Sequence, residues 1–213
     1  DIIVSDVMMP RMNGYKLCKT IKEDINISHI PVILLTARDD RQSQISGYKN
    51  GADGYLSKPF EVEMLMELIR NRLKNREYTK KRYLNAGLIP TPEESTISLT
   101  DETFLIKLNS IIQENIENSN LGIQFICQEV GLGRSSLYNK LKALTGMGAN
   151  EYISKLRIEK AITLISGTDM PFSEIAEKTG FTTPSYFSTT FKQYTGETPS
   201  QYKERKKKGL TDQ

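Results

Sequence analysis

The stretch IIVSDVMMP, residues 2–10, carries an apolar run that ends on a carboxylate. Ile2, Ile3 and Val4 are typical of a short buried strand, because β-branched side chains suit a pleated, covered surface. Asp6 stands where this strand stops and the chain turns. A carboxylate at such a place is either a turn former or a reactive group at the rim of a sheet. The rest of the sequence distinguishes between these two roles.

Two further apolar stretches, PVILLTA (31–37) and GYLSKP (54–59), predict strands. The segments around them have helical patterns and predict helices over residues 15–23, 39–50 and 61–76. Strand–helix alternation of this kind predicts an α/β fold, in which helices cover a parallel sheet.

Polar residues close the three predicted strands: Asp6, Thr36 and Lys58. Ligands collect at the carboxyl ends of the strands in an open parallel sheet. A carboxylate can attack a phosphoryl group, while a hydroxyl and an ammonium hold the transferred oxygens. The set therefore favours phosphoryl chemistry over a simple turn carboxylate. An aspartyl phosphatase is disfavoured, because Met8 occupies the place where such enzymes commonly carry a second carboxylate, so no enzyme is expected.

The composition is that of a globular domain, with 38% hydrophobic and 26% charged residues and a net charge of +3. The apolar runs are far shorter than the about 20 residues that a membrane helix needs, so no membrane contact is expected in this segment. Cys18 and Cys127 have no metal-ligand spacing around them and are expected to be reduced structural thiols. His29 is the single histidine and is expected to be a loop residue.

Residues 77–99 hold two prolines, a basic cluster and small polar residues, which predicts a linker. From Thr100 onward strand signals stop and helical periodicity continues. This part contains an internal repeat, since residues 126–152 resemble residues 175–202. The matching positions differ by 49 before the central turn and by 50 after it, so the second copy has one extra residue in that turn.

Each copy has the order helix, glycine-containing turn, helix, which predicts a helix-turn-helix unit. In both second helices, the apolar residues fall on one face and the hydrogen-bonding residues on the other. The outward residues are Arg134, Ser135, Tyr138, Asn139 and Lys142 in the first copy and Thr183, Ser185, Ser188, Thr189 and Lys192 in the second. Neither helix contains Asp or Glu, which favours binding to double-stranded DNA over a helical bundle with a solvated face.

The segments DIIVSDVMMPRMNGYKLCKTIK (1–22), PVILLTA and GADGYLSKPF (51–60) together resemble the receiver domain of two-component response regulators. The resemblance covers residues 1–76 and implies a flavodoxin-like, doubly wound sheet. It also implies that Asp6 accepts the phosphoryl group, that Thr36 and Lys58 coordinate it, and that Tyr55 is the aromatic switch residue. Asp6 and the backbone carbonyl of Met8 would be Mg²⁺ ligands.

The chain departs from this family in one respect. Two further strands and a helix begin the family's sheet, and the acidic pair that holds Mg²⁺ ends its first strand; neither is present here. We therefore expect a partial receiver with an incomplete metal site, and Mg²⁺ only in an intact receiver. The strand at residues 2–5 would become an edge, which predicts either self-association through residues 1–10 or a weakly stable first third.

Residues 100–208 resemble the AraC-type DNA-binding domain, with the signatures GLGRSSLYNKLKALTGM (131–147) and GFTTPSYFSTTFKQYTGETPSQY (180–202). The resemblance implies an all-α domain. Its expected parts are helix-turn-helix units over 121–146 and 172–196, a connecting helix over 151–165, and a tail over 209–213.

A receiver followed by an AraC-type domain resembles the output end of hybrid two-component systems of Bacteroidetes, which often control polysaccharide utilisation. This implies a phosphorylation-controlled, sequence-specific transcription regulator in the cytoplasm, with tethering to the inner membrane through a longer parent as a further expectation. The implied partners are double-stranded DNA, a histidine kinase in the same or a separate chain, RNA polymerase and a second copy. A stand-alone regulator, or a phosphate-independent DNA-binding protein whose receiver only dimerises, are the alternatives.

Overall fold

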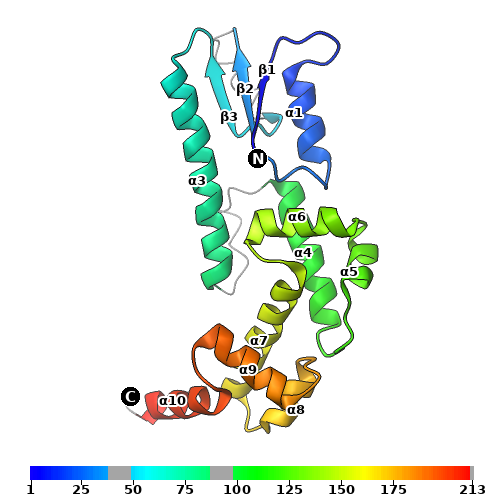
Figure 1. Ribbon diagram of the computed structural model, residues 1–213, viewed down its shortest axis with the longest axis vertical. Coiled ribbons are helices and arrows are strands. Elements are labelled where there is room, and N and C mark those ends of the chain that lie inside the picture. The colour runs from blue at the N-terminus through cyan, green and yellow to red at the C-terminus, as the bar shows by residue number, and fades with distance from the viewer. Residues whose placement is uncertain (38–48, 87–97, 212–213) are drawn as a thin grey trace. The chain divides into compact units, whose positions relative to one another are not determined.

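The computed structural model describes residues 1–37, 49–86 and 98–211 (Figure 1). The chain divides into two compact units. The first contains residues 1–106 and 135–146, and the second contains residues 107–134 and 147–213. None of the described helices is both long and apolar enough to cross a bilayer.

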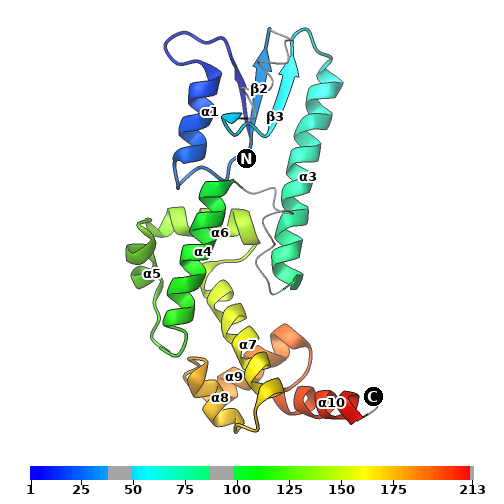
Figure 2. The same ribbon diagram turned by 180° about the vertical axis from the view of Figure 1, so that it is seen from behind.

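The first unit is built on a parallel sheet of β1 (Ile3–Asp6), β2 (Val32–Thr36) and β3 (Gly54–Ser57), in the order β1-β2-β3. Asp6 pairs with Leu35, and Thr36 pairs with Ser57. Figure 2 shows β2 and β3 side by side and pointing the same way, and β1 pairs parallel with β2. The predicted parallel sheet is confirmed, and its register brings the carboxyl ends of the strands to one edge.

Helix α1 (Gly14–Glu23) covers one face of this sheet. Asn13 caps it by accepting a hydrogen bond from the Lys16 backbone N–H at 2.8 Å. Its buried Cys18 and Ile21 belong to an apolar cluster with Val32 and Leu34 of β2. Burial raises the pKa of the Cys18 thiol to about 11, so this cysteine is protonated at neutral pH. Both cysteines are free and buried, as expected.

Helix α3 (Val62–Ala86) covers the opposite face. A Cβ built on Gly54 would lie 3.2 Å from the side chain of Leu68 on α3 and 3.2 Å from the side chain of Ile33. Successive strand residues point to opposite faces, so the Ile33 side chain lies on the face away from α1. Helix α3 therefore packs on that face. The helix continues to Ala86, well beyond its predicted end at residue 76, so the first part of the expected linker over 77–99 is helical. No Gly or Pro interrupts residues 62–86, and Gly87 is the first helix breaker. Most of the helix predicted over 39–50 lies outside the described residues.

The helices that follow match the predicted order. They are α4 (Leu99–Glu114), α5 (Ile123–Val130), α6 (Arg134–Thr145), α7 (Ala149–Gly167), α8 (Phe172–Lys178), α9 (Pro184–Thr195) and α10 (Pro199–Thr211). The connecting helix α7 is longer than the expected 151–165, and α10 continues into the expected tail.

The core of the second unit lies among α7, α8, α9 and α10. Phe187, Phe191 and Tyr202 stack edge to face along it, with ring centroids 5.7 and 5.6 Å apart. Gly180 ends the turn after α8 with φ +73, and a Cβ there would lie 2.2 Å from the Ile116 carbonyl oxygen. Only glycine fits this position, because both the backbone conformation and the space exclude a side chain.

Candidate functional site

The carboxylate of Asp6 lies at the end of β1, on the edge where the strands stop. Its Oδ1 accepts a hydrogen bond from the Met8 backbone N–H at 3.0 Å, and its Oδ2 pairs with the Lys58 ammonium. Both side chains are partly exposed, Asp6 by 33% and Lys58 by 42%. Two residues 52 positions apart in the sequence thus form one accessible ion pair.

The pKa of Asp6 is lowered below its ordinary value. The hydrogen bond from Lys58 is the largest cause, and the Met8 N–H adds to it. Both interactions favour the charged form of the carboxylate. Asp6 is therefore ionised at neutral pH, as a carboxylate nucleophile must be.

Thr36 and Lys58 are joined through the backbone. Thr36 ends β2, is 1% exposed, and its carbonyl oxygen accepts from the Lys58 N–H at 2.6 Å. The Lys58–Pro59 peptide bond is cis. Tyr55 lies half-buried on β3, where it packs against the cluster on the α1 face of the sheet. The structure thus joins Asp6 and Lys58 through their side chains and Thr36 through its main chain.

Gly14 shapes this site, although its spacing in the sequence does not point to it. The Gly14 N–H donates to the Val7 carbonyl at 3.0 Å, and the Val7 N–H donates to the Leu35 carbonyl at 2.7 Å. A Cβ on Gly14 would lie 2.4 Å from the Asp6 carbonyl oxygen. The close approach of α1 to the Asp6–Val7 backbone thus requires glycine.

The residues present do not by themselves form a magnesium site. Mg²⁺ binds oxygen ligands in octahedral array. This edge offers the Asp6 carboxylate, one oxygen of which already pairs with Lys58, and the Met8 carbonyl. Within residues 1–37, 49–86 and 98–211, no group of three or more acidic, histidine or cysteine side chains could hold a metal ion.

On α6, the predicted DNA-contact residues lie on the accessible side of the helix. Leu137, Leu141 and Leu144 are buried on the other side. Tyr138 is 54% exposed, and the Arg134 guanidinium donates to the Gln124 side-chain oxygen at 3.2 Å. The predicted contact residues on this side are Arg134, Ser135, Tyr138, Asn139 and Lys142.

On α9, the predicted face is also accessible. Thr183, Ser185, Thr189 and Lys192 are exposed, and Ser188 is half-buried. The Thr183 hydroxyl caps the helix by accepting from the Tyr186 N–H at 3.1 Å, a role that the sequence analysis did not assign. Tyr186 was not predicted as a contact, yet it is 53% exposed beside this face. As DNA contacts, the residues of both helices remain predictions.

Comparison with known proteins identifies both halves. The response regulator receiver domain matches residues 1–70, and a helix-turn-helix domain matches residues 126–205. "Histidine kinase P4" of Formosa agariphila is 43% identical over 204 residues, which are 96% of this chain and 15% of that protein. The chain therefore spans a small part of that relative's length.

Two further proteins match over larger shares of their own length. "Probable transcriptional regulator ycf29" of Pyropia yezoensis is 30% identical over 162 residues, covering 71% of this chain and 73% of that protein. The solved C-terminal domain of AraT, a response regulator from Geobacillus stearothermophilus, is 30% identical, with a TM-score of 0.45 over 48% of this chain and 84% of that one. The chain belongs to the two-component response regulators, with a receiver domain followed by an AraC-type helix-turn-helix DNA-binding domain.

Proposed function

We propose that this protein is a transcription regulator whose sequence-specific DNA binding is controlled by phosphorylation of Asp6. The ion pair between Asp6 and Lys58 is the observation that carries the proposal. It keeps the carboxylate ionised and accessible at the carboxyl edge of a parallel sheet, on the same chain as a DNA-binding domain.

The reaction is a phosphoryl transfer from a phosphorylated histidine of a kinase. A carboxylate oxygen of Asp6 forms a bond to phosphorus, the P–N bond of the donor breaks, and the electron pair stays on the histidine nitrogen. Lys58 exchanges its contact with the carboxylate for a phosphoryl oxygen, and the Thr36 hydroxyl binds another. The aspartyl phosphate carries more negative charge than the carboxylate did, so it attracts the Lys58 ammonium more strongly. Tyr55 is the expected switch residue.

The kinase in this proposal lies in the same polypeptide. The support is the 43% identity with a protein named as a histidine kinase, of which the matching part is 15%. For a hybrid system of this kind we expect control of polysaccharide utilisation. We also expect the protein to act as a homodimer together with RNA polymerase. Its output domain would lie in the cytoplasm and be tethered to the inner membrane through the longer parent chain. The codons upstream of Asp1 test the arrangement: a kinase domain there supports a hybrid protein, and a start codon shortly before the receiver supports a stand-alone regulator.

Labelling with a small phosphodonor tests the role of Asp6, in a protein extended at its N-terminus by the acidic pair of the receiver. Asp6→Asn should abolish acid-labile phosphate, because it removes the nucleophile. Lys58→Ala should reduce the label without unfolding the protein. Asp24→Asn is the matched control, since Asp24 is an exposed carboxylate that caps the turn at Asn26.

Undiminished labelling of the Asp6→Asn variant would remove Asp6 from its proposed role. If labelling depends on Asp6 but the affinity for DNA does not change with phosphorylation, the receiver acts as a phosphate-independent dimerisation module instead.

A further inference from the structure

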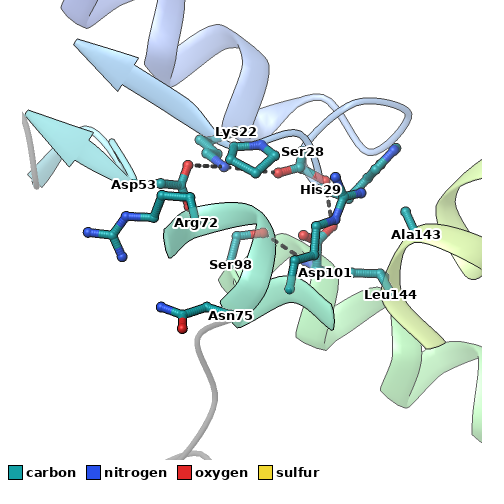
Figure 3. A pocket seen from close by; sticks show the side chains of 12 residues that line it. Lys22, Ser28, His29, Asp53, Arg72, Asn75, Ser98, Asp101, Ala143 and Leu144 are labelled. Atoms are coloured by element: carbon teal, nitrogen blue, oxygen red, sulfur yellow. Dashed lines mark hydrogen bonds and ion pairs between the residues drawn. The ribbon is translucent and has the colours of Figure 1, made fainter. Parts of the chain in front are cut away.

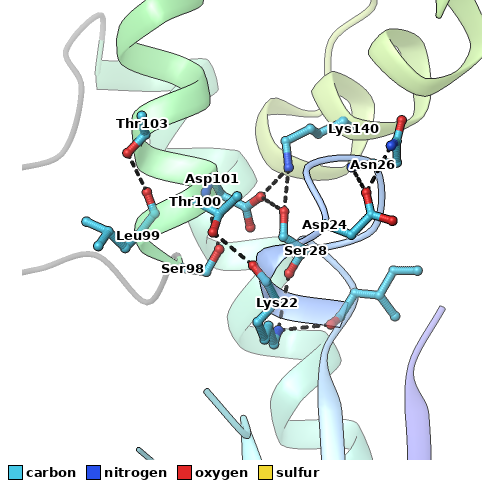
Figure 4. Close-up of polar contacts among 11 residues, drawn as sticks. Lys22, Asp24, Asn26, Ser28, Ser98, Leu99, Thr100, Asp101, Thr103 and Lys140 are labelled. Atoms are coloured by element: carbon cyan, nitrogen blue, oxygen red, sulfur yellow. Dashed lines mark hydrogen bonds and ion pairs between the residues drawn. The ribbon is translucent and has the colours of Figure 1, made fainter. Parts of the chain in front are cut away.

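Helix α6 carries a fully buried ammonium group on the side opposite its exposed face. Lys140 is 0% exposed and pairs with the Asp101 carboxylate at the start of α4, whose side chain is 3% exposed. Its Nζ also donates to the Ser28 hydroxyl at 2.7 Å, and Ser28 donates to Asp101 Oδ1 at 2.7 Å. Figure 4 shows these three side chains converging from α6, α4 and the loop between α1 and β2.

This network of buried polar contacts stabilises one arrangement of α6, α4 and the loop that carries Ser28. A buried ion pair loses the solvation of both charges, so it contributes little net stability but strongly disfavours arrangements that separate the charges. Burial lowers the pKa of Lys140, whereas Asp101 raises it. The ammonium also lies 5.1 Å from the centroid of the Phe104 ring. A movement of α6 too small to admit water would leave both charges buried without partners.

The network continues into the receiver sheet. Lys22 Nζ donates to the carbonyls of Ser28 and Ile30, at 3.2 and 2.9 Å, and pairs with Asp53 at 2.8 Å. Asp53 in turn accepts from the Val32 N–H at 2.7 Å.

Lys22, Ser28, Asp53 and Asp101 line a pocket near the start of β2 and β3 (Figure 3). The same two strands end at Thr36 and Ser57, next to Lys58. A continuous chain of polar contacts thus links helix α6 to the amino ends of β2 and β3, opposite the carboxyl edge at which Asp6 lies.

The network leaves the exposed face of α6 uncovered. Tyr138, Asn139 and Lys142 remain accessible while Lys140 is buried. The contacts of Lys140 therefore leave these side chains accessible to DNA, and they fix the rotation of α6 about its own axis. In the second repeat, the corresponding residue is Thr190, which is buried but uncharged. The buried lysine with its ion pair is thus a feature of the first helix-turn-helix unit.

We propose that Ser28, Asp101 and Lys140 form a positioning network through which the receiver sets the orientation of α6 toward DNA. The proposal deepens the function proposed above and rests on it for the role of α6 in DNA binding. None of the three residues is a DNA contact; each acts by holding α6.

Ser28→Ala tests this network with the loss of one oxygen atom from the receiver. Hydrogen exchange of α6 amides should accelerate, while exchange in α9 stays unchanged. Affinity for a DNA site, selected from a random pool by the wild-type chain, should fall about fivefold, because α6 loses its fixed orientation. Ser110→Ala is the matched control, because Ser110 is exposed on α4 and its hydroxyl donates to Glu114 of the same helix.

A double-mutant cycle keeps the test independent of folding. Lys140→Met alone would leave Asp101 buried and unpaired, so it is combined with Asp101→Leu, which also removes the acceptor of the Ser28 hydroxyl. In that background, Ser28→Ala should have no further effect on exchange or affinity.

Wild-type exchange in the Ser28→Ala variant, or faster exchange with unchanged DNA affinity, would overturn the proposal. The exchange measurement needs no phosphorylation, so its failure is distinct from a failure of Asp6 labelling.

Discussion

At the scale of single residues, two lysines of this chain occupy opposite environments. Lys58 pairs with Asp6 where both side chains are partly exposed, and Lys140 pairs with Asp101 where both are buried. An exposed pair is weak and exchanges readily with solvent or with a phosphoryl oxygen, whereas a buried pair can separate only at high cost. The first pair suits chemistry, and the second suits positioning.

His29 makes the stability of the first unit depend on pH. Burial is the main cause that lowers its pKa to about 4, and the nearby charges of Lys140, Arg76 and Lys22 add to it, while Asp101 opposes them. The unfolded chain binds a proton near pH 6.5, so stability should be lost as pH falls from 6.5 to 4. The loss should reach about 2 kcal/mol, less than the full shift implies, because solvent screens a half-buried group.

Urea unfolding of the wild type and of His29→Gln between pH 7 and pH 4 measures this contribution. The carboxylates titrate in both proteins, so the difference between the two curves isolates His29. The variant should lose less stability in this window, and parallel curves would show that His29 is not buried as a neutral group.

The sequence predicts the first of these lysine pairs but not the second. Asp6 and Lys58 end separate apolar strands, and a parallel sheet must bring such ends together. Lys140 lies in the same helix as the exposed Lys142, and its partner Asp101 is 39 residues away with no pattern linking the two. The role of Gly14 was likewise not predicted. Its need for space arises from the approach of α1 to β1.

At the scale of secondary structure, the helices were predictable where their periodicity was uninterrupted. The second helices of the two repeats, α6 and α9, have apolar residues at helical spacing and clear ends, and the structure places them as expected. The C-terminal part of α3 was missed because Pro90 and Pro92 suggested a linker for the whole segment, although no breaker precedes Gly87. Local composition misleads when it is averaged across a helix end.

The N-cap of α9 allows stability and DNA binding to be separated. Thr183→Ala should cost about 1 kcal/mol of stability, because the Tyr186 N–H loses its acceptor. Thr183→Asp keeps an acceptor and suits the positive end of the helix dipole, so the melting temperature should stay near that of the wild type. Its negative charge should nevertheless weaken DNA binding. Wild-type affinity in the Thr183→Asp variant would place the start of α9 outside the interface.

The exposed face of α6 predicts two kinds of DNA contact. Asn139→Ala should lower specific affinity by about 1–3 kcal/mol if the amide reads a base edge. Lys142→Gln should weaken specific and non-specific binding alike and reduce the salt slope by about one, as expected for a phosphate contact. Lys107→Gln, an exposed lysine on α4, is the charge-matched control. Equal salt slopes for both lysine variants would argue against a phosphate contact at Lys142.

At the scale of the whole molecule, the receiver sheet leaves β1 at an edge of the described strands. Ile3 and Val7 donate their N–H groups to carbonyls of Pro31 and Leu35, at 2.8 and 2.7 Å. Strand groups alternate in direction, so the N–H groups of Val4 and Asp6 face away from β2. An apolar edge of this kind tends to pair with another strand.

Self-association through this edge is the last prediction. Sedimentation of a protein limited to residues 1–213 should show a concentration-dependent dimer, in which β1 pairs with its copy about a twofold axis. Val4 is 39% exposed on β1, and Val4→Lys should shift the chain to monomer, because a charge on an edge opposes strand pairing. Val62→Lys, at a 69% exposed position on α3, should leave the dimer intact. A monomeric wild type, or a dimer that disperses with the Val62→Lys variant instead, would place self-association elsewhere than on β1.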